Sequence, residues 1–280
     1  MTRKYIIEIF QSLVVMLRGL YFSKYCFKGV SKSKTKVRVL ANGPSLNQFL
    51  EDNKGNSNLN DFDYIVMNYM PMHEDFELYK PKFLCLADPM FFQFSHRIDE
   101  VRKLFKVLNS IVHWEMIIVI PHNRIKEFQN FNYIHNPNLK VKPINSYTYA
   151  GLAKFRNSAY NLNFSMPGIY TVANLAIFTA INMNYKYIEV YGIDHNFFDS
   201  MFVTDDNVLC NRMKHFYSNE VSLMPILRND NGKNYKIADY TQSISNMFKS
   251  HDLLSSYAAF KNIEILNCSK DSMVDSYKKR

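Results

Sequence analysis

Short apolar runs alternate with amphipathic segments along most of this chain. The first run, Val37–Ala41, is rich in β-branched residues and lies between polar stretches. Runs of this length and composition are typical of strands buried in a parallel sheet. Apolar residues recur at helical spacing over 96–109 and 171–182, which predicts helices there. We predict further strands in the other apolar runs, at residues 63–68, 83–88, 116–120, 187–191 and 263–267.

The alternation of the two patterns predicts the fold class. Strands that alternate with helices favour an α/β fold with a doubly wound, mainly parallel, Rossmann-like sheet. We assign residues 37–280 to one such domain. Within it, residues 196–255 are polar and aromatic and lack long apolar runs. A long segment of this kind after a sheet strand is typical of a lid or an acceptor-binding insertion.

Residues 1–36 have a different pattern. The stretch 5–22 is mostly apolar, but Glu8, Gln11 and Arg18 interrupt it. A spanning helix needs roughly 20 largely uncharged residues, so we predict an amphipathic helix lying in the membrane interface. A helix packed on its own domain or on a partner subunit, and a true span, are the alternatives. No small-residue cleavage site follows Leu20, which argues against a signal peptide.

The charge and the cysteines narrow the function classes. The net charge is +9, and residues 1–38 hold nine Lys and Arg against one Glu. A nucleic-acid binder would more often spread its charge over a folded face, so we expect no nucleic acid and an anionic membrane surface instead. The four cysteines are scattered without a CxxC pair. They predict neither a zinc motif nor disulfides, and we expect a cytoplasmic protein, peripheral on the inner face of the cytoplasmic membrane.

The turn after the first strand, Asn42-Gly43-Pro44-Ser45, is the most informative motif. Glycine allows close backbone approach to a ligand, proline fixes one φ angle, and Ser45 is expected to cap a helix that begins near Leu46. A strand, loop and helix at the carboxyl edge of an α/β sheet typically bind a nucleotide. The glycine spacing fits neither a Walker loop nor GxGxxG, and an ordinary strand-to-helix turn is the alternative.

Several predicted strands end in an amide or a carboxylate side chain. Ligands of open α/β sheets bind outside the carboxyl ends of the strands, so we predict that these side chains converge on one site. Turn chemistry, which also favours Asn and Asp, is the alternative. The residues concerned are Asn42, Asn68, Asp88, Asp194 and Asn267.

Four segments in order, residues 42–46, 62–68, 167–177 and 184–194, resemble the bacterial sialyltransferases of glycosyltransferase family 42. They are also similar to a wider group that includes flagellin glycosyltransferases and proteins related to an archaeal pterin diphosphokinase. The resemblance covers about residues 37–195. It implies a variant GT-A fold that takes a CMP-linked sugar acid and inverts its anomeric centre.

The resemblance also implies roles for individual residues. Asn42 and Gly43 would lie along the phosphate and ribose of the nucleotide, together with the rest of their turn. Asn68 would contact the donor, and Asp194 would hold the far end of the site.

Other positions match the family by place but not always by residue type. Pro167 stands where the family has Ser, and with Gly168 it would lie by the cytosine or the donor carboxylate. Asp88 replaces an Asn, and Asn196 replaces a Tyr. The family uses two tyrosines to steady the leaving phosphate, and Tyr217 is a candidate by type.

Sialyl transfer needs a base for the acceptor hydroxyl, and histidine suits that role. The family places its catalytic histidine near His215, so His215 is the first candidate for the base. His195 is the second candidate, and the third possibility is that neither histidine is the base. CMP leaves with a single phosphate, so we expect no metal and no cofactor beyond the donor itself. Asp205 and Asp206 lie in the polar insertion and are expected to be a solvated pair.

These observations predict a sialyltransferase-like enzyme that acts on a glycan or lipid-linked acceptor, such as lipopolysaccharide or capsule. An Mg²⁺-dependent nucleotide phosphotransferase or diphosphokinase on the same fold is one alternative, with Asp88 and Asp194 as metal ligands. A membrane-tethered assembly module without catalysis is another. The sequence leaves the sugar acid, the acceptor, the linkage and a homo-oligomer open.

Overall fold

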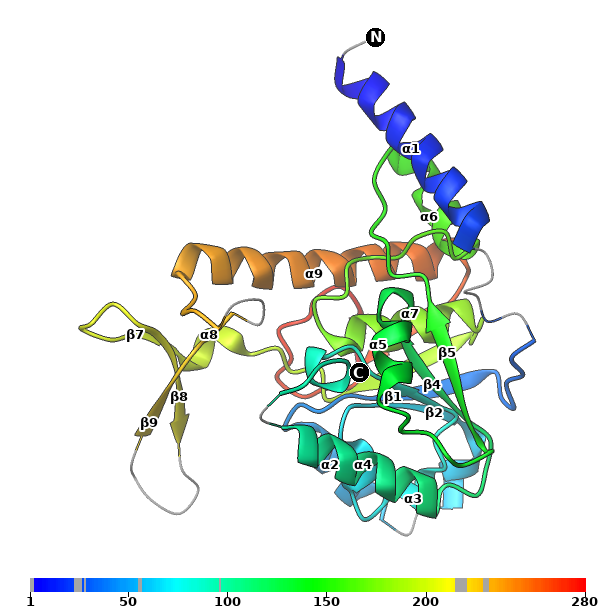
Figure 1. The fold of residues 1–280 in the computed structure, drawn as a ribbon, viewed down its shortest axis with the longest axis vertical. Coiled ribbons are helices and arrows are strands. Elements are labelled where there is room, and N and C mark those ends of the chain that lie inside the picture. The colour runs from blue at the N-terminus through cyan, green and yellow to red at the C-terminus, as the bar shows by residue number, and fades with distance from the viewer. Residues whose placement is uncertain are drawn as a thin grey trace.

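The computed structural model describes residues 3–22, 27, 29–54, 57–95, 97–214, 221–228 and 232–280. Its centre is an eight-stranded sheet in the order β11-β10-β6-β1-β2-β3-β4-β5, in which every neighbouring pair is parallel (Figure 1). This confirms the predicted α/β fold class. The strands are β1 (Lys36–Leu40), β2 (Asp63–Met67), β3 (Phe83–Cys85), β4 (Met116–Pro121), β5 (Leu139–Ile144), β6 (Tyr187–Tyr191), β10 (Glu264–Asn267) and β11 (Lys278–Lys279).

Helices connect these strands and cover the sheet. The α-helices are α1 (Arg3–Phe22), α2 (Leu46–Asp52), α3 (Phe76–Tyr79), α4 (Ile98–Ile111), α5 (Ile125–Asn130), α6 (Ala153–Asn161), α7 (Val172–Asn182), α8 (Phe197–Ser200) and α9 (Ile237–Phe260). Short 3₁₀ helices span Ser57–Asp61, Met70–Met72, Pro89–Phe91 and His122–Arg124.

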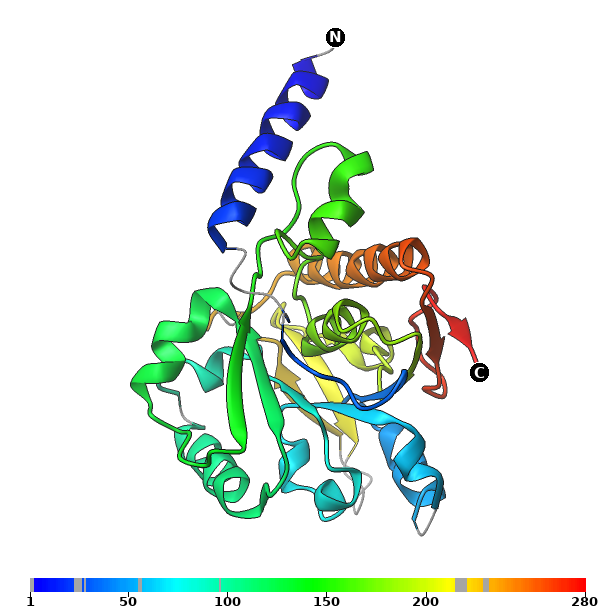
Figure 2. The ribbon, with the colours of Figure 1, turned by 90° about the vertical axis from the view of Figure 1, so that its right-hand side faces the viewer.

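Two apolar cores lie on opposite faces of the sheet, because successive residues of a strand point to opposite sides. Val39 packs into the core formed with α7 and α9, whereas Leu40 packs into the core formed with α2 and α4. Figure 2 shows α9 and α7 on one side of the sheet and α2 and α4, in mid-blue and teal, on the other. Both faces of β4 are buried, which explains why its sequence is an unbroken apolar run.

The sheet has a topological switch between β1 and β6. The chain moves outward from β1 to β5 and then returns to the other side of β1 through α6 and α7. The loops that follow β1 and β6 therefore run in opposite directions. A crevice at such a point is where open α/β sheets bind ligands.

The sequence analysis predicted neither strand β5 nor the three strands within residues 196–255. Strand β5 lies at the sheet edge and alternates lysines with apolar residues, so it lacks the apolar run of a buried strand. Residues 196–255, the predicted insertion, contain both strands and helix. Their first part forms a separate antiparallel sheet of β7 (Met201–Val203), β8 (Leu209–Lys214) and β9 (Val221–Pro225), while α9 begins at Ile237 and packs against α7.

Helix α1 projects from the body of the molecule (Figure 1). One face of it rests on the segment before α6, where the backbone N–H of Leu152 donates to Ser12 Oγ at 2.9 Å. Gly19 lies against the ring of Phe164, close enough that a Cβ would overlap it. Among the described residues no helix is both long and apolar enough to cross a bilayer.

A buried carboxylate fixes the segment that leads into β1. Oδ2 of Asp63 accepts hydrogen bonds from the backbone N–H groups of Ser33 (3.0 Å) and Lys34 (3.1 Å) and from Tyr185 Oη (2.7 Å).

We predict that Asp63→Ala lowers the free energy of unfolding by about 3 kcal/mol, because three donors lose a charged acceptor. Tyr185→Phe removes one of these bonds and should cost about 1 kcal/mol. Urea unfolding measures both, and equal losses would contradict this account.

Candidate functional site at the carboxyl ends of the strands

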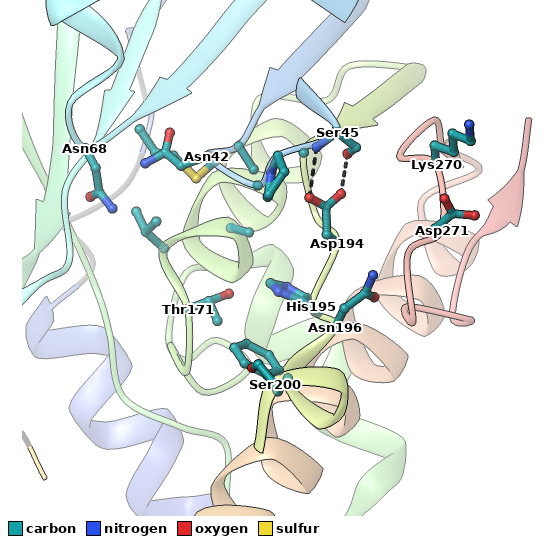
Figure 3. Close-up of a pocket in the computed structure, with 18 of the residues that line it drawn as sticks. Asn42, Ser45, Asn68, Thr171, Asp194, His195, Asn196, Ser200, Lys270 and Asp271 are labelled. Carbon is teal, nitrogen blue, oxygen red and sulfur yellow. Dashed lines mark hydrogen bonds between the residues drawn. The ribbon is translucent and has the colours of Figure 1, made fainter. Parts of the chain in front are cut away.

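A cavity of about 710 Å³ opens at the carboxyl ends of β1, β2 and β6 (Figure 3). Its volume is in the range of small-molecule sites, roughly 300–1,000 Å³. It lies at the topological switch of the sheet. The lining residues come from segments 41–45, 67–68, 171–173, 192–200 and 270–271, together with Gln48 and Asn211.

The turn after β1 is held by a carboxylate from the loop that follows the neighbouring strand β6. Ser45 donates its backbone N–H to Oδ2 of Asp194 at 3.0 Å and its hydroxyl to Oδ1. The prediction that Ser45 caps α2 is wrong: it makes no side-chain cap hydrogen bond, and its hydroxyl is taken by Asp194 instead. Asp194 therefore joins two segments that lie 149 positions apart.

Two glycines let the same two loops touch. The backbone N–H of Gly43 donates to the carbonyl of Gly192 at 2.9 Å. A Cβ on Gly43 would lie 2.4 Å from Asp194 Oδ2 and 2.5 Å from that carbonyl. Gly192 has a φ of 75°, a conformation that favours glycine. Gly43 is thus required for contact between the loops.

Asn68 enters the cavity from β2 in a left-handed backbone conformation, with φ 49°. Its Oδ1 is buried and has no hydrogen-bond partner in the described part of the chain. Asp88 lies near Asn68 but does not line the cavity. Burial raises the pKa of Asp88, against the lowering effects of Asn68 and Arg97. Asn68 therefore lines the cavity, while its Oδ1 is enclosed by protein.

The structure brings together some of the predicted residues and separates others. Asn42, Gly43, Pro44, Ser45, Asn68, Asp194 and His195 all line the cavity. Asn267 does not, because its Nδ2 donates to Ser272 Oγ and the carbonyl of Val274 at 3.0 Å each and forms a turn. His215 and Tyr217 lie outside the described residues, so their roles stay predictions.

Pro167 and Gly168 are buried and do not line the cavity either. The ring of Tyr170 covers Gly168, whose carbonyl accepts from Ser250 Oγ at 2.7 Å. The same segment reaches the cavity four residues later, through Thr171–Ala173 at the start of α7.

The N-terminus of α7 opens onto the cavity. Asn174 Oδ1 accepts from the backbone N–H of Thr171 at 3.1 Å, in a capping box that fixes this end of the helix. Asn174 is fully buried, and its Nδ2 has no partner among the described residues. The partial positive charge of a helix N-terminus attracts anions. Lys270 is the sole Lys or Arg among the described residues that line the cavity, alongside the carboxylates of Asp194 and Asp271.

Behind His195 lies a buried chain of polar rings. Its Nε2 is 3.3 Å from Nε2 of His251, whose Nδ1 is 2.9 Å from Tyr277 Oη. Burial lowers the pKa of His195 to about 4, although Asp194 raises it. Burial and then the neighbouring His195 lower the pKa of His251 to about 3. Both imidazoles are therefore neutral at pH 7.

Sequence reasoning missed the contributions from the end of the chain and from the smaller sheet. Lys270 and Asp271 follow β10, and Asn211 lies on β8. None of them stands at a predicted strand end. His251 is 56 positions from His195 inside a long helix, and no local pattern distinguishes it from a core residue.

No known protein family matches the sequence, and no curated protein matches it at a significant level. Among solved structures, the fold is similar to one described as the MAf glycosyltransferase from Magnetospirillum magneticum AMB-1, with a TM-score of 0.47 and 12% sequence identity. The likeness covers 96% of this chain and 38% of that one. A likeness at this TM-score and identity says nothing about what the chain binds or catalyses.

The contact between the two loops can be tested by adding one methyl group. We predict that Gly43→Ala lowers the free energy of unfolding by about 3 kcal/mol, because backbone and a carboxylate occupy the space that the Cβ needs. Gly29→Ala is the matched control. Its Cβ meets nothing within 4 Å, and only the positive φ opposes it, at about 1 kcal/mol. Chemical denaturation measures both, and a Gly43→Ala protein as stable as wild type would contradict the close contact.

Proposed function

We propose that this chain is an inverting glycosyltransferase that moves a nonulosonic acid, such as sialic acid, from its CMP ester to a glycan or lipid-linked acceptor. One observation carries the proposal. The turn 42–45, Asn68 and Asp194, which are part of the resemblance to the family 42 sialyltransferases, line a single cavity at the switch point. They come from three different strand ends, so their meeting is a property of the fold.

The charges around the cavity fit a nucleoside monophosphate ester. Among the described residues, Lys270 and the N-terminus of α7 face it, together with the carboxylates of Asp194 and Asp271. A phosphodiester such as a CMP-sugar carries a single negative charge on its phosphate, and backbone N–H groups at a helix end can bind it. The several charges of a nucleoside triphosphate would need more cations or a metal ion.

The arrangement of carboxylates favours the glycosyltransferase over the phosphotransferase alternative. That alternative needs Asp88 and Asp194 as ligands of one Mg²⁺ ion. Asp88 does not line the cavity, and both oxygens of Asp194 accept hydrogen bonds from Ser45. In the described residues no three His, Cys, Asp or Glu side chains are grouped to hold a metal.

The proposed reaction needs one base and one set of hydrogen-bond donors. The acceptor oxygen attacks the anomeric carbon from the face opposite CMP, the bond to the phosphate oxygen breaks, and CMP leaves with the electron pair. The hydroxyl proton of the acceptor passes to the base. With a pKa of about 4, His195 is a weak base at neutral pH, so the base role falls to His215, which lies outside the described residues.

Helix α8 and the smaller sheet supply the wall that we assign to the acceptor. Phe197 and Ser200 belong to α8, and Asn211 belongs to β8, next to Ser200 at 3.3 Å. Figure 1 shows α8 and β7–β9 projecting to one side of the large sheet. Loops added to a rigid scaffold commonly set substrate specificity.

The donor and its independence of metal can be tested together. We predict CMP release from at least one CMP-linked nonulosonic acid, at the same rate with and without EDTA. Asn42→Ala should lower kcat/KM roughly ten- to hundredfold, because the enzyme loses one hydrogen bond to the charged CMP-sugar.

Asn47→Ala is the matched control, because Asn47 is an exposed asparagine on α2 that does not line the cavity. Turnover of ATP that stops with EDTA, without CMP release, would replace this function by the phosphotransferase. An Asn42→Ala protein as active in cells as wild type, with no turnover of either donor, would favour the assembly module.

We also propose that α1 attaches the enzyme to the cytoplasmic face of an anionic membrane, where a lipid-linked acceptor would be found. Its outer face is apolar and uncovered: Phe10, Leu13, Met16 and Leu17 are 53–68% exposed. Arg3, Lys4 and Arg18 lie on the same helix. Apolar residues that enter the headgroup layer, beside cations that attract anionic lipid, are typical of an interfacial helix.

We predict that the protein floats with vesicles of phosphatidylglycerol and phosphatidylcholine in a density gradient, and that Leu13→Glu with Leu17→Glu abolishes this. Leu78→Glu is the control, because Leu78 on α3 is also half-exposed. The substitutions should leave stability unchanged, since the α1 leucines face outward. Equal flotation of all variants would exclude this surface, and a dimer that only Leu13→Glu with Leu17→Glu dissociates would assign the face to a second copy instead.

A further inference from the structure

Three side chains from distant parts of the sequence form a hydrogen-bonded chain that ends at the cavity. His195 follows β6, His251 lies in α9 and Tyr277 precedes β11. His251 is fully buried and Tyr277 is 6% exposed. The rings of Phe197 and Phe248 lie against His195, and Figure 3 shows His195 between Thr171 and Asn196 at the cavity.

Each contact in the chain holds one hydrogen atom, so the chain has two possible directions. His251 is neutral at pH 7 and carries a proton on one ring nitrogen only. If Nδ1 carries it, His251 donates to Tyr277, and the hydroxyl hydrogen of the tyrosine has no acceptor in the described part of the chain. If Nε2 carries it, Tyr277 donates to Nδ1 and His251 donates to His195.

In the second direction the hydroxyl of Tyr277 and both ring nitrogens of His251 have hydrogen-bond partners. Buried donors that lack an acceptor are destabilising, and Tyr277 is almost fully buried. Burial raises the pKa of Tyr277 well above its usual value, so its hydroxyl keeps its proton and remains a donor. His195 then accepts at Nε2 and, being neutral, carries its own proton on Nδ1. That nitrogen makes no hydrogen bond to the described residues. It is not one of the fully buried atoms without a partner, so it remains accessible from the cavity.

We propose that Tyr277 and His251 fix the tautomer of His195, so that its Nδ1–H faces the cavity as a neutral hydrogen-bond donor. This rests on the proposed function for its purpose: the donor would bind an oxygen of the leaving phosphate and stabilise the charge that develops there. No proton is transferred in this role. Tyr277 and His251 are positioning residues, and they act only through His195.

The groups around the chain agree with a neutral histidine pair. Asp194 favours a charged His195, but burial outweighs it, and two adjacent imidazolium rings would repel each other. Lys270 and Asp271 line the same cavity with opposite charges. On the far side, the charge of Asp252 raises the pKa of Tyr277, and Asp252 accepts a hydrogen bond from Ser276 rather than from the tyrosine. A neutral imidazole that donates from Nδ1 binds an anion without the cost of burying a second charge.

The tautomers can be read directly by long-range ¹H–¹⁵N correlation NMR on histidine-labelled protein at pH 7, with His195→Gln and His251→Gln used for assignment. We expect His195 protonated at Nδ1 and His251 protonated at Nε2. Tyr277→Phe should release the fixed tautomer of His195. Tyr160→Phe is the matched control, since Tyr160 is also buried but its hydroxyl has no partner in the described part of the chain.

His195 protonated at Nε2 in the wild-type protein would overturn the proposal. An unchanged tautomer in folded Tyr277→Phe would remove the tyrosine from the chain, and if that variant does not fold the wild-type spectrum decides alone. The measurement needs no substrate, so a failed CMP-sugar assay would reject the proposed function and leave the tautomer result standing.

If the proposed function and the proposed tautomer both hold, Tyr277→Phe should lower kcat about tenfold with little change in the KM of the CMP-sugar, because only the transition state gains from the oriented N–H.

Discussion

The site depends on the hydrogen bonds that join the loops after β1 and β6. Asp194 accepts two hydrogen bonds from Ser45, and Gly43 donates to the carbonyl of Gly192 across the same gap. The two strands are neighbours in the sheet, but their connections run in opposite directions, so their ends would otherwise diverge. These hydrogen bonds hold the two loops together and fix one wall of the cavity.

The rest of the site is built on that wall by groups that need the surrounding fold. Helix α7 is buried along most of its length and begins at the cavity, and the side chain of Asn68 lines the cavity from the end of β2. Polar side chains from several strand ends line the one cavity at the switch point. The carboxyl edge of an open α/β sheet is where ligands bind, which is the physical reason for placing the ligand there.

The buried histidines add a second layer of organisation. Helix α9 packs on α7 and at the same time carries His251 to the back of His195. Burial keeps both rings neutral, which makes His195 a hydrogen-bond donor or acceptor and a poor base. One helix thus stabilises the sheet and sets the chemical character of a residue in the cavity.

The sequence by itself determined the alternation of strands and helices, the buried strands from 37 to 191, and the candidates Asn42, Asn68 and Asp194 at strand ends. These follow from local patterns: an apolar run is a strand because both of its faces are buried, and a polar residue after it lies at the sheet edge. The edge strand β5, the boundary of α9, the role of Ser45 and the meeting of His195 with His251 and Tyr277 were decided only by the tertiary structure. Each depends on which segment packs beside another, and hydrogen bonds between residues 56 or 149 positions apart leave no local pattern in the sequence.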